Sequence, residues 1–168
     1  MPFEYVTNIT AVRQVLLDHN TTTATPDLSA DLVTRIGTTT SIVIGDPETQ
    51  MVRFDDYPAI YIRVADKEEE AAGLGETGPA RARKTANVTY DIIGLLGKES
   101  GIASHASVTT DLYRMARNIE GVFQQESNLS TTALWCHPSR TEFAAPLDIQ
   151  GSLVKAVLIE VEARYHFR

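Results

Sequence analysis

The sequence predicts a single α+β domain in which helices pack on one face of a mainly antiparallel sheet. Its 168 residues match the length of one ordinary domain. Three segments alternate between apolar and polar residues, which is typical of strands with one face in the core and the other in solvent. A long helical stripe lies between the second and third of these segments, and this order favours an α+β fold.

Two helices are predicted near the start of the chain. In residues 8–20 apolar side chains recur at steps of three and four, and Asn8 or Thr10 is expected to cap the helix. Residues 26–37 predict a second, shorter helix, because a proline suits its first turn and a glycine stands at its end.

Five segments around these helices predict strands. Residues 41–44 and 51–54 are expected to form a short hairpin around a Gly-Asp-Pro turn, and residues 59–65, 85–96 and 157–167 alternate over longer runs. The positions expected on the polar face are Tyr61 and Arg63 in the first long segment, Asn87, Thr89 and Asp91 in the second, and Glu160, Glu162, Arg164 and His166 in the third. A face of this kind is either solvated or docked against a partner.

The strongest helix is predicted over residues 104–126. Its apolar stripe is formed by Val108, Leu112, Met115, Ile119 and Val122. At about 1.5 Å per residue such a helix is roughly 30 Å long, enough to cover one face of the sheet. Residues 133–137 predict a further short strand, and Pro138 and Pro146 are expected to bound an irregular link after it.

Residues 66–84 predict a long charged loop between two strands. Their large apolar residues are too few to pack a core, and a connection this long in a compact domain is usually functional or disordered. Acidic residues gather in the first half and basic residues in the second: Glu68, Glu69, Glu70, Arg81, Arg83 and Lys84. The two halves can pair with each other or with a neighbouring copy of the chain, and a solvated loop is the alternative for an isolated monomer.

Composition removes several classes of protein. Twenty-two acidic and fifteen basic residues give a net charge of −7, whereas a general nucleic-acid binder needs a basic face. A single cysteine, Cys136, forbids an internal disulfide and a zinc site built on several thiolates. The chain opens with neither a basic region nor an apolar block, and no apolar run reaches the roughly 20 residues that span a bilayer. We therefore expect a protein made in a reducing cytoplasm, without a membrane partner.

No motif predicts catalysis, a metal or a cofactor. The string GLGETG at residues 73–78 matches a dinucleotide-binding pattern, but the acidic run before it and the absence of a following helix make the match a coincidence. Asp55 and Asp56 are typical of a turn. Cys136 and His137 are neighbours in a predicted strand, so their side chains point to opposite faces and cannot act as a nucleophile and its base.

The histidines are also scattered along the sequence. His19 and His105 are expected at helix ends and His166 on the charged face of the last strand, while Cys136 is expected to be buried beside Trp135. These positions favour structural roles over a metal site.

The arrangement resembles the tail-terminator, or tail-completion, proteins of tailed bacteriophages. The resemblance depends on an N-terminal helix, the strand segments DYPAIYIR at 56–63 and VTYDII at 88–93, the long helix from residue 104, a variable segment through EFAAP at 142–146, and the alternating strand at 157–167. It covers the chain from about residue 7 to the end.

This resemblance implies a structural virion protein that forms a ring, usually a hexamer, on the head-proximal end of the tail tube. Such a ring ends tube polymerisation and offers a surface for joining tail to head. Its partners would be copies of itself, the tail tube protein and the neck or connector proteins, and DNA would pass through without specific binding. The location would be the tail of the virion, assembled in the host cytoplasm. An acidic ring would repel the DNA phosphates.

The charged residues of the 66–84 loop are the site hypothesis under this interpretation. Glu68, Glu69, Glu70, Arg81, Arg83 and Lys84 are expected to contact a neighbouring subunit or the tube. Two alternatives stay open: a neck or head-completion connector protein, which would also oligomerise, and a small cytoplasmic enzyme, which would show a pocket with converging polar groups.

Overall fold

The computed structural model describes residues 3–37, 40–47, 57–72, 83–97, 105–145, 147–149 and 152–167. Two helices and six strands lie within these ranges. In chain order they are α1 (Tyr5–Asp18), β1 (Ile42–Ile44), β2 (Ala59–Ala72), β3 (Arg83–Gly97), α2 (His105–Gln125), β4 (Trp135–Phe143), β5 (Leu147–Ile149) and β6 (Ser152–Phe167).

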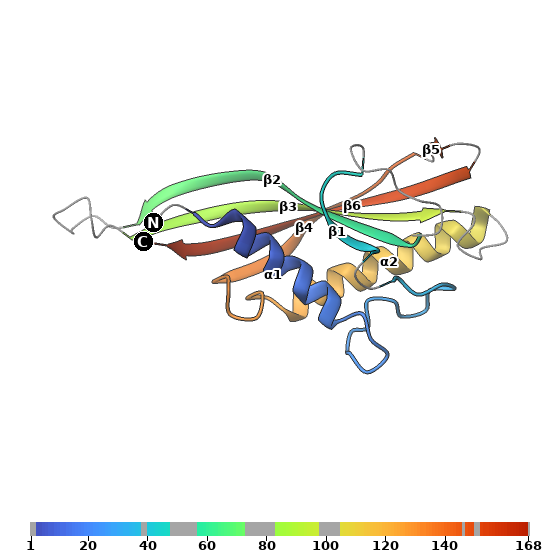
Figure 1. The fold of residues 1–168 in the computed structure, drawn as a ribbon, viewed down its shortest axis with the longest axis horizontal. Helices are drawn as coiled ribbons and strands as arrows, with labels where there is room; N and C mark the ends of the chain where they lie inside the picture. Colours follow the sequence, from blue (N-terminus) through green and yellow to red (C-terminus); the bar gives the residue numbers. More distant parts are fainter. Residues whose placement is uncertain are drawn as a thin grey trace.

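The strands form one sheet with the order β1-β2-β3-β6-β4, and β5 pairs with the first part of β6. The β1–β2 pair is parallel and the other pairs are antiparallel. In Figure 1 the long strands β2, β3 and β6 run along the length of the molecule, and both helices lie on the same side of them. The predicted fold class, an α+β domain with a mainly antiparallel sheet, is confirmed.

The main core lies between the helices and the face of the sheet that they cover, here called the inner face. α1 contacts β1 and β2, and α2 contacts β3, β6 and β4. All five residues of the predicted α2 stripe are buried, and they meet inward-facing strand residues such as Ile60, Tyr90 and Ile159. The helix and the sheet are close together at Gly94, where a Cβ atom would lie 2.5 Å from Met115 Sδ, so a larger residue there would displace the Met115 side chain.

The end of the sheet where β2 finishes and β3 begins is called the hairpin end. There an aromatic cluster joins the start of the chain to the end of β6. The Phe3 ring meets the rings of Tyr165 and Phe167 edge to face, at centroid distances of 5.4 and 5.7 Å. Lys67 Nζ lies 5.1 Å from the Phe3 ring centroid and 5.0 Å from that of Tyr5, a cation–π geometry. These contacts hold residues before α1 against the inner face.

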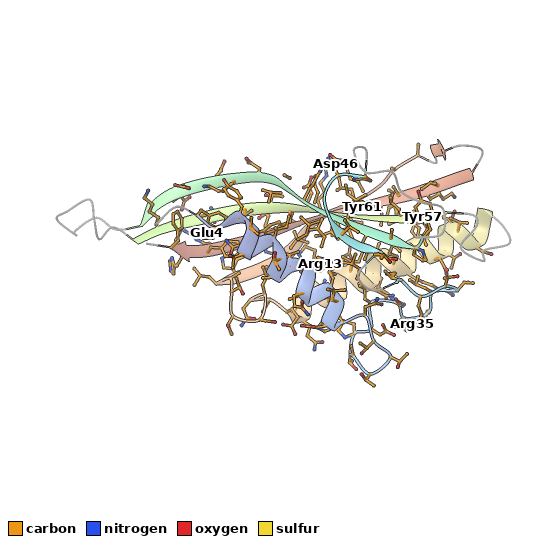
Figure 2. The ribbon with its side chains drawn as sticks, in the orientation of Figure 1. Glu4, Arg13, Arg35, Asp46, Tyr57 and Tyr61 are labelled. Atoms are coloured by element: carbon orange, nitrogen blue, oxygen red, sulfur yellow. The ribbon has the colours of Figure 1, made fainter. Side chains whose placement is uncertain are left out.

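A second apolar cluster lies on the opposite, outer face, at the end of the sheet near β5. It contains Tyr57, Ala59, Tyr61, Leu95, Val154 and Ala156, all buried (Tyr57 and Tyr61 are labelled in Figure 2). The alternation of residues 59–65 predicts Tyr61 on a polar face with Arg63. That prediction is right for the direction of the side chain and wrong for its surroundings, because the outer face is apolar at this end.

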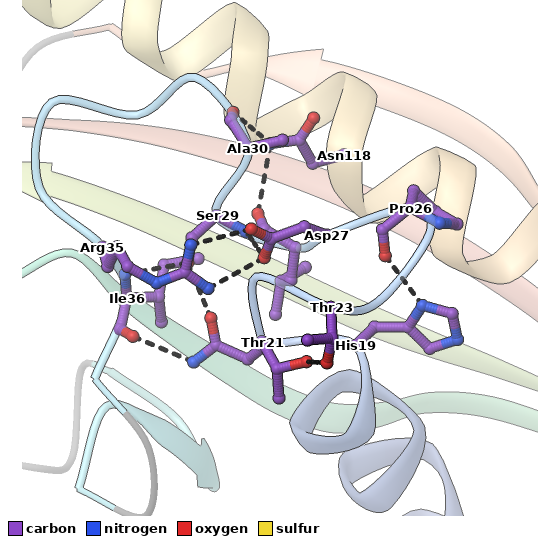
Figure 3. Close-up of polar contacts among 12 residues, drawn as sticks. His19, Thr21, Thr23, Pro26, Asp27, Ser29, Ala30, Arg35, Ile36 and Asn118 are labelled. Atoms are coloured by element: carbon purple, nitrogen blue, oxygen red, sulfur yellow. Dashed lines mark hydrogen bonds and ion pairs between the residues drawn. The ribbon is translucent and has the colours of Figure 1, made fainter.

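The predicted second helix over residues 26–37 is wrong. These residues form successive turns, and Asp31 has a φ of 61°, a left-handed conformation that ends a helix. Local side chains compete for the backbone: the Ser29 N–H donates to Asp27 Oδ1 at 3.0 Å. Asn118 on α2 donates to the carbonyl of Ala30 at 2.8 Å (Figure 3). Such distant partners override the local helical pattern.

Several element boundaries also differ from the prediction. α1 begins at Tyr5 after Glu4, which makes no side-chain capping bond, and the expected cap Asn8 is buried within the helix. β1 pairs with β2 in parallel instead of forming a hairpin, and the expected partner at 51–54 lies outside the described residues. β4 continues through Pro138, with a register shift directly after it. A proline is tolerated there because β4 is an edge strand.

The 66–84 loop is shorter than predicted. Pairing between β2 and β3 continues out to Ala72 and Arg83, so residues 66–72 and 83–84 belong to the sheet. These polar segments have no apolar face of their own, and the backbone hydrogen bonds between β2 and β3 hold them in the sheet. Residues 73–82, with the GLGETG string, lie outside the described residues, as do Asp55 and Asp56.

Candidate assembly surface

Polar side chains of four neighbouring strands form one continuous surface on the outer face at the hairpin end. We call it the outer polar face. It contains Asp66, Glu68 and Glu70 from β2, Thr85, Asn87 and Thr89 from β3, Glu162, Arg164 and His166 from β6, and Trp135 and His137 from β4. Side chains alternate along a strand, so these positions share one side, and the helices lie on the other.

A β-bulge in β2 determines which acidic residues reach this surface. The β2–β3 register shifts between Val64 and Asp66, which leaves Ala65 as the extra residue. Without the shift, Asp66 would point to the inner face, and the alternation of every later residue of β2 would be reversed. The bulge therefore places Asp66 and Glu68 outward.

Cross-strand ion pairs separate the outer polar face from the apolar cluster near β5. Arg63 Nε donates to Asp91 Oδ2 at 2.8 Å, and its Nη1 donates to Asp46 at 2.9 Å. The hydrogen bond that Arg63 donates to Asp91, more than the one it donates to Asp46, raises the pKa of the Arg63 guanidinium. On the β4 side of β6, Arg140 Nη1 lies 3.8 Å from Glu160 Oε1. This row forms a charged boundary across the sheet.

A pocket of about 390 Å³ lies within the outer polar face. Each of the four strands contributes to its walls, among them through Asp66, Glu68, Asn87, Trp135, Glu162 and Arg164. Arg164 is held to one side, since its Nη2 donates to Glu70 at 3.1 Å and to Thr85 Oγ1 at 3.4 Å. The remaining charged groups of the wall are carboxylates, so the pocket is acidic.

The three glutamates of the site hypothesis do not form one patch. Glu68 and Glu70 are on the outer polar face, whereas Glu69 points to the inner side and forms an ion pair with Lys67. That hydrogen bond lowers the pKa of Glu69 and raises the pKa of Lys67. Consecutive strand residues face opposite ways, which is why a run of like charges is divided between two surfaces.

The basic half of the hypothesis is only partly within the described residues. Arg81 lies outside them, and Arg83 is the first residue of β3. Lys84 is exposed and pairs in register with Phe167 of β6. Among the described residues, Glu70 binds Arg164 of β6, and the expected pairing of the acidic with the basic half stays a prediction.

Sequence reasoning missed that these residues form a pocket. The polar positions of β3 and β6 were visible as alternating runs, but their adjacency depends on β6 lying between β3 and β4. Trp135 was expected only as a neighbour of the buried Cys136. It is half-buried on the outer face, with its ring centroid 5.0 Å from that of His137.

The nucleophilic and histidine side chains occupy structural positions. Cys136 is buried and His137 exposed on the opposite face, as predicted. Burial raises the pKa of the Cys136 thiol to about 11, which keeps it protonated near neutral pH. His19 ends α1, where its Nδ1 lies 2.8 Å from the Pro26 carbonyl oxygen, and His166 is exposed on β6.

The described ranges contain neither a metal-binding cluster nor a membrane-spanning helix. Within them, no group of three or more histidine, cysteine, aspartate or glutamate side chains converges closely enough to hold a metal ion. Neither helix found there is long and apolar enough to span a membrane.

No protein-family model matches this sequence, and no curated protein matches it.

Proposed function

We propose that the chain is a structural virion protein whose copies form a ring at the head-proximal end of a phage tail tube. The resemblance to tail terminators makes this ring a hexamer. The ring would end tube polymerisation and provide the surface for joining the head. The observation that carries the proposal is the outer polar face, a broad charged surface that the helices leave uncovered.

The edges of the sheet support the same proposal. Among the described strands, none pairs with the outer edge of β2 beyond Ile62 or with the outer edge of β4. Two different edges on opposite sides of a sheet suit a head-to-tail contact, in which one surface of a subunit meets a different surface of the next. Such contacts close into rings when the rotation between subunits allows it.

Charge gives these edges selectivity. The exposed part of β2 carries four acidic residues, Asp66, Glu68, Glu69 and Glu70, and Arg140 and Glu142 form an ion pair on β4. Charged edge strands discourage indiscriminate pairing, so only a partner with matching charge would join. A net charge of −7 for each subunit would also keep the phosphates of passing DNA from adhering to the ring.

The proposal is tested first by the assembly state of the purified full chain. Electron microscopy and solution mass should show discrete closed rings, alone or after addition of tail tubes. A chain that stays monomeric with and without tubes would contradict the proposal. Deletion of its gene in the parent phage separates the two virion alternatives: overlong headless tails indicate a terminator, DNA-filled heads without tails indicate a connector, and normal particles contradict both.

The basic residues of the site hypothesis are tested in the same assay. Reversing the charges of Arg81, Arg83 and Lys84 to glutamate should weaken ring assembly or docking on tubes. The matched control exchanges the same residues for the other basic amino acid, Arg81→Lys, Arg83→Lys and Lys84→Arg, and should assemble normally. Unchanged assembly after charge reversal would remove these residues from the interface.

A further inference from the structure

The pocket in the outer polar face has more acceptors than the described residues supply with donors. Glu68 and Glu162 form no ion pair with any residue in the described part of the chain, and the Asp66 carboxylate accepts a hydrogen bond from the neighbouring Lys67 N–H at 2.8 Å. The one cation in the wall, Arg164, is already bound to Glu70 and Thr85. The pocket therefore presents uncompensated negative charge.

Asn87 adds a side-chain acceptor that has no hydrogen-bond donor among the described residues. It lines the pocket between the acidic residues of β2 and those of β6. Among the described side chains, its Oδ1 is the buried oxygen that accepts no hydrogen bond. A buried acceptor without a donor costs about 1–3 kcal/mol, so a turn of the Asn87 side chain that brings Oδ1 to an N–H donor in the pocket would remove that cost.

The dimensions of the pocket indicate what kind of cation it suits. Its carboxylates do not converge as metal ligands do, since no cluster able to hold a metal ion is found in the described ranges. The acceptors are instead spread over three strands within about 390 Å³. A planar guanidinium carries five N–H donors that spread over several acceptors in this way. The half-buried Trp135 ring at the wall offers the aromatic surface on which guanidinium groups stack.

We propose that this pocket receives an arginine side chain presented by a protein partner. Glu68 and Glu162 provide the attraction, Asn87 Oδ1 accepts an N–H, and Trp135 stacks on the guanidinium. The proposal concerns the pocket of the single chain, so it holds whether or not copies of the chain close into a ring. Lysine is the weaker ligand, because its ammonium is a compact point charge without a plane to stack.

Trp135 makes the pocket directly measurable, because it is the sole tryptophan of the chain. The full-length protein is titrated with short peptides in which arginine, lysine or glutamate alternates with glycine. The arginine peptide should change the tryptophan fluorescence saturably and shift the NMR signal of the Asn87 side-chain amide. The lysine peptide should bind more weakly, and the glutamate peptide should not bind.

The acidic residues are then tested by a pair of variants with equal charge changes. Glu68→Gln combined with Glu162→Gln should weaken arginine-peptide binding about tenfold or more, as expected when close charge pairs are lost. Glu4→Gln combined with Asp18→Asn removes the same charge from exposed positions in and beside α1 and should leave binding unchanged. All four substitutions are at exposed side chains, and circular dichroism checks that both variants fold.

Three results would overturn the proposal. The first is the absence of a saturable fluorescence change with the arginine peptide. The second is equal binding of the glutamate peptide. The third is an equal loss of affinity in the two double variants, which would mean that the peptide responds to the overall charge of the protein and not to the pocket. None of these outcomes bears on ring formation, so the two proposals fail separately.

Discussion

Two polar regions of this molecule differ in how many of their polar groups have hydrogen-bond partners among the described residues. One is the turn segment at residues 19–37, which packs against α2, and the other is the outer polar face. In the turn segment, Asn20 Nδ2 donates to the carbonyls of Ile36 and Gly37 at 2.9 and 3.1 Å, and Ser29 Oγ donates to Asn20 Oδ1 at 2.6 Å. In the outer polar face, the carboxylates of the pocket meet few donors.

The difference separates polar residues that build the fold from polar residues available to a partner. The polar groups of the turn segment bond to one another and to its backbone, as Figure 3 shows for Arg35, Asp27 and Ser29. Satisfied buried networks of this kind fix a single conformation. Charges on an uncovered sheet face are solvated and contribute little to folding, which leaves them available to a partner such as the arginine side chain proposed above.

The largest effect on stability is expected from Asn118→Ala. The Asn118 amide is 4% exposed and donates to the carbonyls of Leu28 and Ala30 at 3.2 and 2.8 Å. Removal leaves two carbonyls without their donor, at a cost of about 2–4 kcal/mol in the free energy of unfolding. Urea denaturation measures it. The control is Arg117→Ala, next in sequence but 63% exposed, which should cost about 1 kcal/mol or less. Equal losses would contradict the structural role of Asn118.

A smaller loss is expected from Asp91→Ala at the boundary of the outer polar face. The Asp91 carboxylate is 8% exposed and binds Arg63, which is 40% exposed. Water can solvate part of the guanidinium and Asp46 still binds it, so we expect a loss of about 1–2 kcal/mol, below that of a fully buried pair. Thermal and urea unfolding measure it. If the loss is as small as that of an exposed ion pair, this row is not a boundary, and the outer polar face continues through it.

The sequence predicts the regular parts of this fold well. The stripe from Val108 to Val122 and the alternation of β3 and β6 are repeated patterns, and the structure confirms both. It fails where distant residues decide. The turns at 26–37 depend on a hydrogen bond that Asn118 of α2 donates and on one that Asp111 of α2 accepts, and local periodicity cannot indicate such partners.

The candidate site is predictable to a lesser extent. The charge of Glu68 and Glu162 is visible in the sequence, but their common surface depends on the strand order and on the bulge at Ala65. A single extra residue in a strand reverses the faces of those that follow. The run from Glu68 to Glu70 therefore predicts an acidic segment, but not which side chains share a surface.

Acid should affect the turn segment through Asp27. The bidentate hydrogen bond from Arg35, at 2.7 and 2.9 Å, lowers the pKa of the Asp27 carboxyl. A carboxyl with a lowered folded-state pKa stabilises the protein fully above its unfolded pKa of about 3.9, and this stabilisation is lost as the pH falls through the folded value. Because Arg35 is 41% exposed, the contribution is about 1 kcal/mol or less.

The measurement compares unfolding of the wild type and of Asp27→Asn between neutral pH and about pH 2. The variant should be less stable at neutral pH and should lose less stability on acidification. Asp31→Asn is the control, since its carboxylate is 67% exposed, and its profile should follow that of the wild type. Parallel curves for Asp27→Asn and the wild type would show that this ion pair does not contribute to folding.

The smallest effect is expected within the outer polar face, where Glu162→Gln should change the free energy of unfolding by about 0.5 kcal/mol or less. Glu162 is exposed and shares the pocket with Asp66 and Glu68, so loss of its charge relieves repulsion and any change should be stabilising at low salt. Glu70→Gln removes the same charge from the same face but breaks a bond to Arg164, so it should destabilise slightly. Urea unfolding at low and high salt distinguishes the two signs. A loss above about 1 kcal/mol for Glu162→Gln would mean that its charge is satisfied within the fold, and the contrast between the two polar regions would fail.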